Sequence, residues 1–151
     1  MTDSFKNIEN WYIDMNREEI KKILPHREPM LLVDEVYLNE DGSATGYYNV
    51  RGDEFFLQGH FPGNPVVPGV IQCEIMAQTS CILFQDKMKD GTLPLYTGLD
   101  KVKFRGMVKP GDRIKIDITT RRERHPFYFM HGELSVDGKV CANGDFSFAI
   151  M

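Results

Sequence analysis

The chain contains 151 residues, of which 42% are hydrophobic and 26% are charged, and its formal net charge is -4 at pH 7. A prior of roughly 150 residues per domain predicts one domain with one hydrophobic core. The acidic balance argues against general nucleic-acid binding, and no apolar run approaches the ~18 residues of a membrane-spanning helix.

The three cysteines have no CxxC spacing and are odd in number. This pattern disfavours both a disulfide framework and a zinc site, and it is typical of a reducing compartment. The polar, acidic N-terminus does not resemble a signal peptide. The sequence therefore predicts a cytoplasmic protein.

The N-terminal part is expected to begin with a flexible leader over residues 1–14, followed by a single domain over residues 15–151. A short helix is predicted after Asn16, a plausible N-cap residue followed by two glutamates, and Pro25 should end it. The apolar run at residues 30–33 predicts the start of a strand.

Two further elements precede the middle of the chain. Asp41-Gly42 is a hairpin signal, so residues 43–50 should return as an antiparallel strand. Residues 51–68 are rich in proline and glycine and should be irregular.

The apolar stretch 69–88 is long enough for about five helical turns. Its apolar residues cover most of the helix circumference, which predicts a helix enclosed by protein.

From Leu95 onward, apolar residues alternate with polar ones, and turn sequences lie at 110–112 and 137–138. One strand is predicted around Val102 and Phe104, a second around Ile114, Ile116 and Ile118, and two more over 127–136 and 139–150. The chain should thus form about six strands, mostly antiparallel, and one buried helix. The expected fold class is α+β, with the sheet curled around the helix.

Residues 58–74 carry the clearest functional pattern. His60 lies in a rigid segment, and an imidazole suits proton abstraction at neutral pH. Pro68-Gly69-Val70 begins the buried helix, where free N–H groups can stabilise a developing oxyanion. Glu74 lies about one turn into that helix, where desolvation favours the neutral, proton-donating carboxyl.

A base, an oxyanion hole and an acid together suit the removal of a proton and a hydroxyl from adjacent carbons beside a carbonyl group. Each residue also has an ordinary structural interpretation. A histidine after a glycine is commonly a turn residue, and a lone glutamate on an apolar helix often pairs with a lysine or arginine. The residues alone leave these alternatives open.

Three segments resemble one family. HFPGNPVVPGVIQCEIMAQ closely resembles the signature of (3R)-3-hydroxyacyl-[acyl-carrier-protein] dehydratases of the FabZ type. REEIKKILPHREPMLLVDEV resembles the N-terminal helix and first strand of that family, and LDKVKFRGMVKPGDRI resembles its strand-turn-strand segment. The resemblance extends from about Met15 to the end of the chain.

The resemblance implies a hot-dog fold, in which an antiparallel sheet wraps a central helix, and a homodimer that commonly assembles into a hexamer. It implies that His60 of one subunit and Glu74 of the other are catalytic and that Gly69, with Val70 beside it, supplies the oxyanion amide. The implied reaction is dehydration of a 3-hydroxyacyl thioester, carried by acyl carrier protein, to the trans-2-enoyl thioester. No metal or nucleotide cofactor is expected.

Further roles follow from the same resemblance. Tyr96 is the candidate gate of an acyl tunnel, and Phe61, Met76 and Leu95 are candidate lining residues. His26 is interpreted as structural. Because carrier proteins are acidic, the docking site should be basic. The candidate docking residues are Lys101, Lys103, Arg105, Lys109, Arg121, Arg122 and Arg124.

Three rival functions remain at this point. A bifunctional dehydratase/isomerase would also move the double bond to make unsaturated fatty acids. A hot-dog acyl thioesterase would release a free thiol. A module that only binds acyl chains would show no turnover, and the presence of both His60 and Glu74 argues against it.

Overall fold

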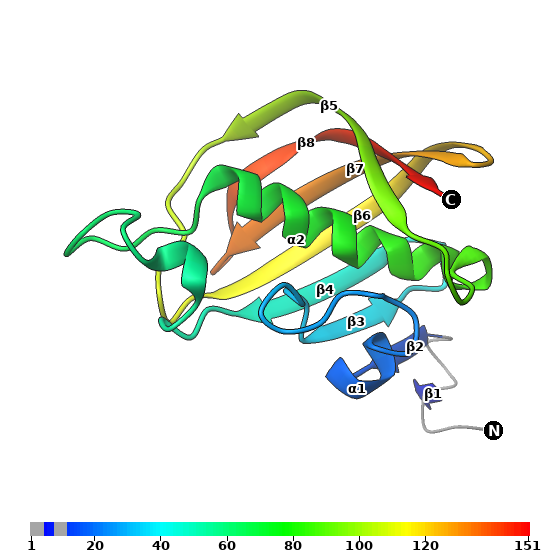
Figure 1. Cartoon of the computed structure of the whole chain (residues 1–151), viewed down its shortest axis with the longest axis horizontal. Coiled ribbons are helices and arrows are strands. Elements are labelled where there is room, and N and C mark those ends of the chain that lie inside the picture. The colour runs from blue at the N-terminus through cyan, green and yellow to red at the C-terminus, as the bar shows by residue number, and fades with distance from the viewer. Residues whose placement is uncertain (1–4, 8–11) are drawn as a thin grey trace.

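The computed structural model describes residues 5–7 and 12–151, and Figure 1 shows a curved sheet that wraps around one long helix. The helix α2 spans Gly69–Cys81, and the short helix α1 spans Arg17–Ile20. Two 3-10 segments, η1 at Phe55–Leu57 and η2 at Ile82–Lys87, lie before and after α2. No helix in this part of the chain has the length and apolar character needed to cross a membrane.

The sheet contains eight described strands in the order β1-β2-β3-β4-β6-β7-β8-β5, and every pairing is antiparallel. In chain order they are β1 (Phe5–Asn7), β2 (Tyr12–Met15), β3 (Glu35–Leu38), β4 (Ala44–Asn49), β5 (Pro94–Phe104), β6 (Arg113–Arg124), β7 (Phe127–Val136) and β8 (Lys139–Ile150). The expected α+β architecture is confirmed. The six predicted strands correspond to β3–β8, and β1 and β2 are additional.

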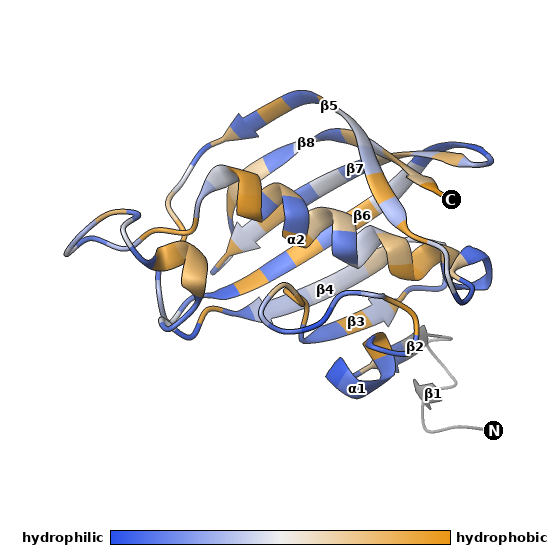
Figure 2. Cartoon of the chain, in the orientation of Figure 1, coloured by the Kyte–Doolittle hydropathy of each residue, from blue (hydrophilic) through white to orange (hydrophobic). Residues whose placement is uncertain are grey.

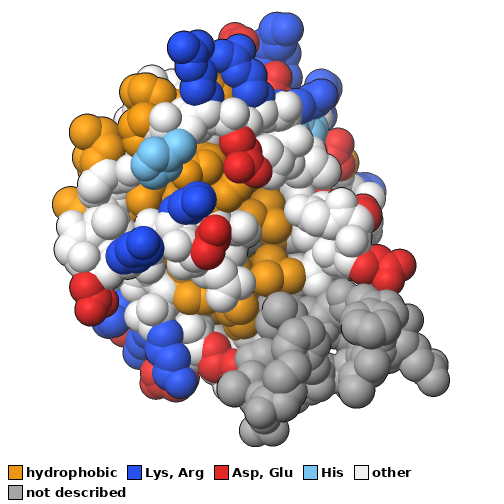
Figure 3. Space-filling model, turned by 90° about the vertical axis from the view of Figure 1, so that its right-hand side faces the viewer, with side chains coloured by type: hydrophobic (Ala, Val, Ile, Leu, Met, Phe, Trp, Pro, Cys, Tyr) orange, Lys and Arg blue, Asp and Glu red, His pale blue; other side chains and the backbone are white. Residues whose placement is uncertain are grey.

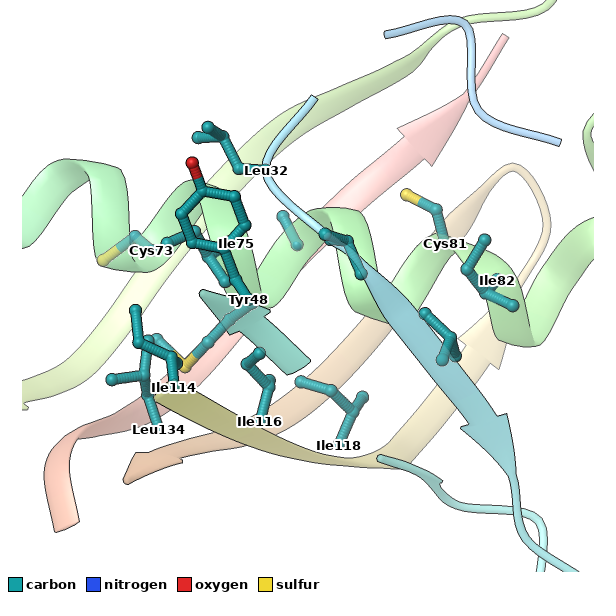
Figure 4. Close-up of a cluster of buried hydrophobic side chains, with 14 of the residues drawn as sticks. Leu32, Tyr48, Cys73, Ile75, Cys81, Ile82, Ile114, Ile116, Ile118 and Leu134 are labelled. Atoms are coloured by element: carbon teal, nitrogen blue, oxygen red, sulfur yellow. The ribbon is translucent and has the colours of Figure 1, made fainter. Parts of the chain in front are cut away.

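The core lies between α2 and the concave face of the sheet. Ile114, Ile116 and Ile118 of β6 have no exposed surface, and polar residues alternate with them on the outer face (Figure 2). They face Ile75 and Met76 of α2, which are at most 1% exposed, and Figure 4 shows part of this cluster. Nine residues of α2 are buried, as expected for a helix enclosed by protein.

Sheet and helix approach each other closely at Gly46 of β4. A Cβ atom at this position would lie 2.7 Å from Cγ2 of Thr79 on α2. Gly46→Ala is therefore expected to lower the free energy of unfolding by about 1–3 kcal/mol. Urea denaturation measures this change. In the double variant Gly46→Ala/Thr79→Ala the added methyl has room, so the two costs should not add. Simple additivity would contradict the close contact.

The strand expected to start at residues 30–33 starts later than predicted. Leu31, Leu32 and Val33 are buried, but they belong to a loop, and the strand β3 begins only at Glu35. Side chains distant in sequence bind the backbone of this loop. Arg17 donates to the carbonyls of Leu31 and Val33, and Gln78 donates to the carbonyl of Met30 while accepting from the N–H of Leu32. The apolar run therefore needs no sheet partner.

The end of the long helix also differs from the expectation. The α-helix ends at Cys81, and the chain continues as the 3-10 segment η2, so the single long helix is shorter than predicted. The domain boundary expected at residue 15 falls inside β2, which pairs with β3. Residues 1–4 and 8–11 lie outside the described residues, and the flexibility of the leader stays a prediction.

The helix α1 begins as predicted. The side chain of Asn16 accepts from the N–H of Glu19, and the carboxyl of Glu19 accepts from the N–H of Asn16, which forms a capping box. Arg17 and Lys21 of this segment each lie 3.1 Å from a carboxylate oxygen of Glu28. Backbone and side-chain hydrogen bonds thus connect the start of the domain to the loop before β3.

This cluster predicts acid sensitivity. The backbone N–H of Glu28, then Lys21 and Arg17, lower the pKa of the Glu28 carboxyl from 4.5 to about 2. The unfolded chain binds this proton more readily, so the stabilisation is complete above pH 4.5 and is lost as the pH falls toward about 2. Glu28→Gln should therefore show a smaller loss of unfolding free energy between about pH 7 and about pH 3 in urea titrations. Equal losses would contradict the assignment.

Candidate active site

His60 lies in the loop between η1 and α2, and its ring is half-buried. The ring atom Nδ1 lies 3.0 Å from the carbonyl oxygen of Val66, which can only accept a hydrogen bond. This contact places the proton of the neutral ring on Nδ1 and leaves the lone pair of Nε2 as the available base. The backbone N–H of Val66 donates in turn to the carbonyl of His60, so both parts of the residue are fixed by the same loop.

The N-terminus of α2 presents unused donors next to this loop. Pro68 is the N-cap residue, and its carbonyl accepts from the N–H groups of Ile71 and Gln72. Within residues 12–151, no hydrogen bond occupies the N–H groups of Gly69 and Val70. These two groups are therefore free to bind an oxyanion at the positive end of the helix.

Glycine at position 69 has a steric reason. A Cβ atom there would lie 2.8 Å from the ring of Phe104, which reaches across from β5. The ring thus lies directly beside the donor amide and leaves no room for a side chain. This arrangement agrees with the expectation that Gly69 supplies an open amide, although the oxyanion role itself stays a prediction.

Glu74 lies on α2, with its side chain 23% exposed. Its Oε2 atom accepts from Nε2 of Gln78 at 2.9 Å and lies 3.4 Å from Nε2 of His26. Two cavities reach Glu74. One, of about 100 Å³, also contacts His26, Tyr96 and Leu95, and the other, of about 360 Å³, is lined by Val70, Tyr96 and Leu99 among others.

The two cavities beside Glu74 do not include the expected base, since His60 lines neither of them. The side of the molecule that carries Glu74 is also incompletely covered. Val70, Leu99 and Phe104 are apolar residues with 72%, 53% and 53% of their surface exposed. Exposed apolar residues therefore lie on the same side of the molecule as this acidic group.

Tyr96 lines both cavities beside Glu74. Its hydroxyl donates to the carbonyl of Cys73, and its ring contacts Phe146 edge-on at 6.0 Å between centroids. Burial raises the pKa of this hydroxyl, so it remains a donor at neutral pH. This position suits the gate predicted for Tyr96.

The other candidate tunnel residues occupy different places. Leu95 lines the smaller cavity with Glu74, and its role in a tunnel stays a prediction. Phe61 is 56% exposed and stacks on the ring of His60 at 4.3 Å. Met76 is 1% exposed and lies in the core, where its sulfur is close to Gly132 of β7. Of the four residues, the single chain therefore gathers only Leu95 and Tyr96 around Glu74.

The candidate docking residues are spread over β5, the loop that follows it and the end of β6. All seven are exposed. The strand register places Lys103 level with Asn143 and Glu133, whereas Arg124 is level with Phe127 and hence with the opposite end of β8. Lys and Arg side chains gather along the upper edge of the face in Figure 3. Within one chain, Arg121 also lies 3.9 Å from Asp145.

The cysteines beside Glu74 do not form a competing nucleophile. Burial, with a smaller contribution from Glu74, raises the pKa of the Cys73 and Cys81 thiols. Both thiols therefore stay protonated at neutral pH, and a protonated thiol is a poor nucleophile.

The antiparallel sheet curved around a central helix defines a hot-dog fold. Two solved structures share it: the dehydratase heterocomplex ApeI:P from Xenorhabdus doucetiae (TM-score 0.73, 23% identity, covering 86% of this chain and 89% of that one) and a putative phenylacetic acid degradation-related thioesterase from Ralstonia eutropha (TM-score 0.56, 22% identity, covering 73% and 77%). At these identities the likeness concerns the fold alone.

The model of the FabA-like domain matches residues 24–145, and the chain belongs to that family. Curated relatives are similar over nearly their full length. The 3-hydroxyacyl-[acyl-carrier-protein] dehydratase FabZ of Clostridium beijerinckii is 42% identical over 90% of this chain and 99% of its own. The protein of the same name from Petrotoga mobilis is 40% identical over 90% of this chain and 98% of its own.

Sequence reasoning missed the surroundings of Glu74. His26 was expected to be structural, yet its ring reaches Glu74, and Gln78 had no assigned role. The spacing of Glu74 and Gln78 offered a signal, because residues four apart on a helix lie side by side. The contact with His26 joins residues 48 positions apart, and no local pattern predicts it.

Proposed function

We propose that this protein removes water from (3R)-3-hydroxyacyl thioesters on acyl carrier protein, giving trans-2-enoyl thioesters in the fatty-acid elongation cycle. The observation that carries the proposal is the 42% identity to a FabZ dehydratase that spans 99% of that relative. The geometry supports it, because in the described part of the chain no hydrogen bond involves Nε2 of His60 or the backbone N–H groups of Gly69 and Val70.

The proposed step uses three groups. Nε2 of His60 takes a proton from C2 of the acyl chain, and the electron pair moves toward the thioester carbonyl. The N–H groups of Gly69 and Val70 stabilise the resulting oxyanion. As the C2–C3 double bond forms, the bond from C3 to its hydroxyl breaks, and the Glu74 carboxyl protonates the departing oxygen. The products are the enoyl thioester and one water molecule.

We propose further that His60 and Glu74 come from different subunits of a homodimer, which the hexamer of the family would contain three times. The strand β5 supports this assembly, because it forms an edge of the sheet and is exposed along nearly its whole length. An edge strand offers unpaired N–H and C=O groups to a second copy. The exposed apolar residues Leu99 and Phe104 of β5, and Val70 at the start of α2, would then be buried.

We also propose a gate for the acyl tunnel, a docking surface for the carrier protein and a location in the cell. Tyr96 gates the acyl tunnel, supported by its position beside Glu74 in both cavities. Acyl carrier protein docks on basic residues near the tunnel mouth, since an acidic partner favours a basic surface. A cytoplasmic location is supported by the three cysteines, all buried and unpaired.

Incubation with 3-hydroxyacyl carrier-protein thioesters of several lengths, followed by mass analysis, tests the proposal. Loss of one water to a trans-2-enoyl thioester is the expected result. Release of a free thiol would instead indicate a thioesterase, and a cis-3-enoyl product would add isomerase activity. Binding without turnover would contradict an enzyme, and turnover of coenzyme A thioesters alone would remove the carrier protein from the proposal.

A further inference from the structure

One oxygen of the Glu74 carboxyl is held from two sides, and the other is not. Oε2 accepts from Nε2 of Gln78 at 2.9 Å and lies 3.4 Å from Nε2 of His26. Within residues 12–151, the hydrogen bond and the ion pair of the Glu74 carboxyl both involve Oε2. Oε1 is therefore the oxygen available to a substrate in the cavities that Glu74 lines.

Gln78 is itself fixed. It is 1% exposed, its Nε2 atom also donates to the carbonyl of Met30 at 2.7 Å, and its Oε1 atom accepts from the N–H of Leu32 at 2.8 Å. Nε2 of this buried amide thus donates to both Met30 and Glu74, and the amide oxygen accepts from Leu32. Gln78 thus connects Glu74 rigidly to the loop that follows His26.

His26 approaches the same oxygen from that loop. Its Nε2 atom faces Glu74, and its buried Nδ1 atom has no hydrogen-bond partner in the described part of the chain. If the ring hydrogen were on Nδ1, a buried N–H group would have no acceptor. If it is on Nε2, that N–H can donate to the carboxyl oxygen, and only the lone pair of Nδ1 stays without a partner. The favoured tautomer therefore carries its hydrogen on Nε2. The 3.4 Å separation is longer than an ideal hydrogen bond, as is common at catalytic groups without substrate.

We infer that His26 is a positioning residue for the catalytic acid: with Gln78 it holds Oε2 of Glu74, so that Oε1 carries the proton and faces the leaving hydroxyl. The inference rests on the proposed dehydration. It assigns to His26 an action on the acid that a purely structural histidine would not have. Removing the imidazole should leave substrate binding intact but let the carboxyl rotate away from the productive geometry.

The test compares two substitutions in the full-length protein with purified 3-hydroxyacyl carrier-protein thioester. His26→Leu removes the donor and is expected to lower kcat by about tenfold to 100-fold, with KM changed by no more than about twofold. His26→Gln places an amide N–H near the position of Nε2 and should restore kcat to within about threefold of wild type. His131→Leu, at a histidine that pairs with Asp145 on the outer face, is the matched control and should leave kcat unchanged.

Three outcomes decide the inference. If His26→Leu retains wild-type kcat while Glu74→Gln is inactive, the inference is overturned and the dehydratase proposal stands. If His26→Leu and His26→Gln lose activity equally and also melt at the same lowered temperature, His26 is only structural. If Glu74→Gln itself keeps full activity, the assignment of the acid fails first, and the positioning role fails with it.

Discussion

His60→Ala is expected to lower kcat for dehydration of a 3-hydroxyacyl carrier-protein thioester by about 100-fold to 10,000-fold, the usual contribution of a positioned general base. The reason is specific to the ring. Its Nδ1 proton is committed to the carbonyl of Val66, so Nε2 is the only basic position, and an alanine supplies none. Steady-state kinetics with product analysis by mass measures the effect.

The ring of His60 also fixes its loop, so a control must show that the variant still folds. Circular dichroism and thermal melting should show that His60→Ala keeps the wild-type fold. His125→Ala is a matched variant, at a histidine whose Nδ1 atom contacts the hydroxyl of Tyr128 outside the candidate site, and it should keep its activity. Dehydration by His60→Ala at the wild-type rate would refute the base assignment.

Glu74→Gln is expected to lower kcat by a similar factor of about 100-fold to 10,000-fold. An amide has the shape of the carboxyl and can still accept from Gln78, so the helix and its surroundings should be preserved. It cannot give a proton to a departing hydroxyl. The variant should therefore bind substrate with little change in KM and fail in turnover.

The hydration direction provides an independent check of Glu74. A catalyst accelerates both directions of one reaction by the same factor, so addition of water to the trans-2-enoyl thioester should fall in parallel. Glu133→Gln, at a glutamate on β7, is the matched carboxyl control. Loss of dehydration with full retention of hydration in Glu74→Gln would be inconsistent with a single acid.

Local signals predicted much of the fold. The capping box at Asn16 and Glu19 started α1, and the turns at Asp41-Gly42 and Asp137-Gly138 joined antiparallel strands as expected. The alternation of apolar and polar residues predicted a sheet with one buried face, and the three isoleucines of β6 lie on that face. Each of these features depends on residues that are neighbours in sequence, which is why a pattern could reveal them.

The errors arose where distant side chains replaced local structure. Residues 30–33 have the composition of a strand, but Arg17 and Gln78 satisfy their backbone groups, and neither residue is near them in sequence. The same holds for the site. Spacing identified His60 and Glu74 as candidates, but it could not reveal that His26 faces the acid or that one chain leaves His60 apart from the cavities around Glu74.

The most direct test of the shared site is to co-express His60→Ala and Glu74→Gln chains in equal amounts. If each site combines His60 of one subunit with Glu74 of the other, a mixed dimer has one site with both defects and one intact site. Random pairing makes about half of the dimers mixed, so the preparation should regain roughly a quarter of wild-type activity although each variant alone is inactive. If both groups of a site came from one chain, every site would carry a defect, and the mixture would stay inactive.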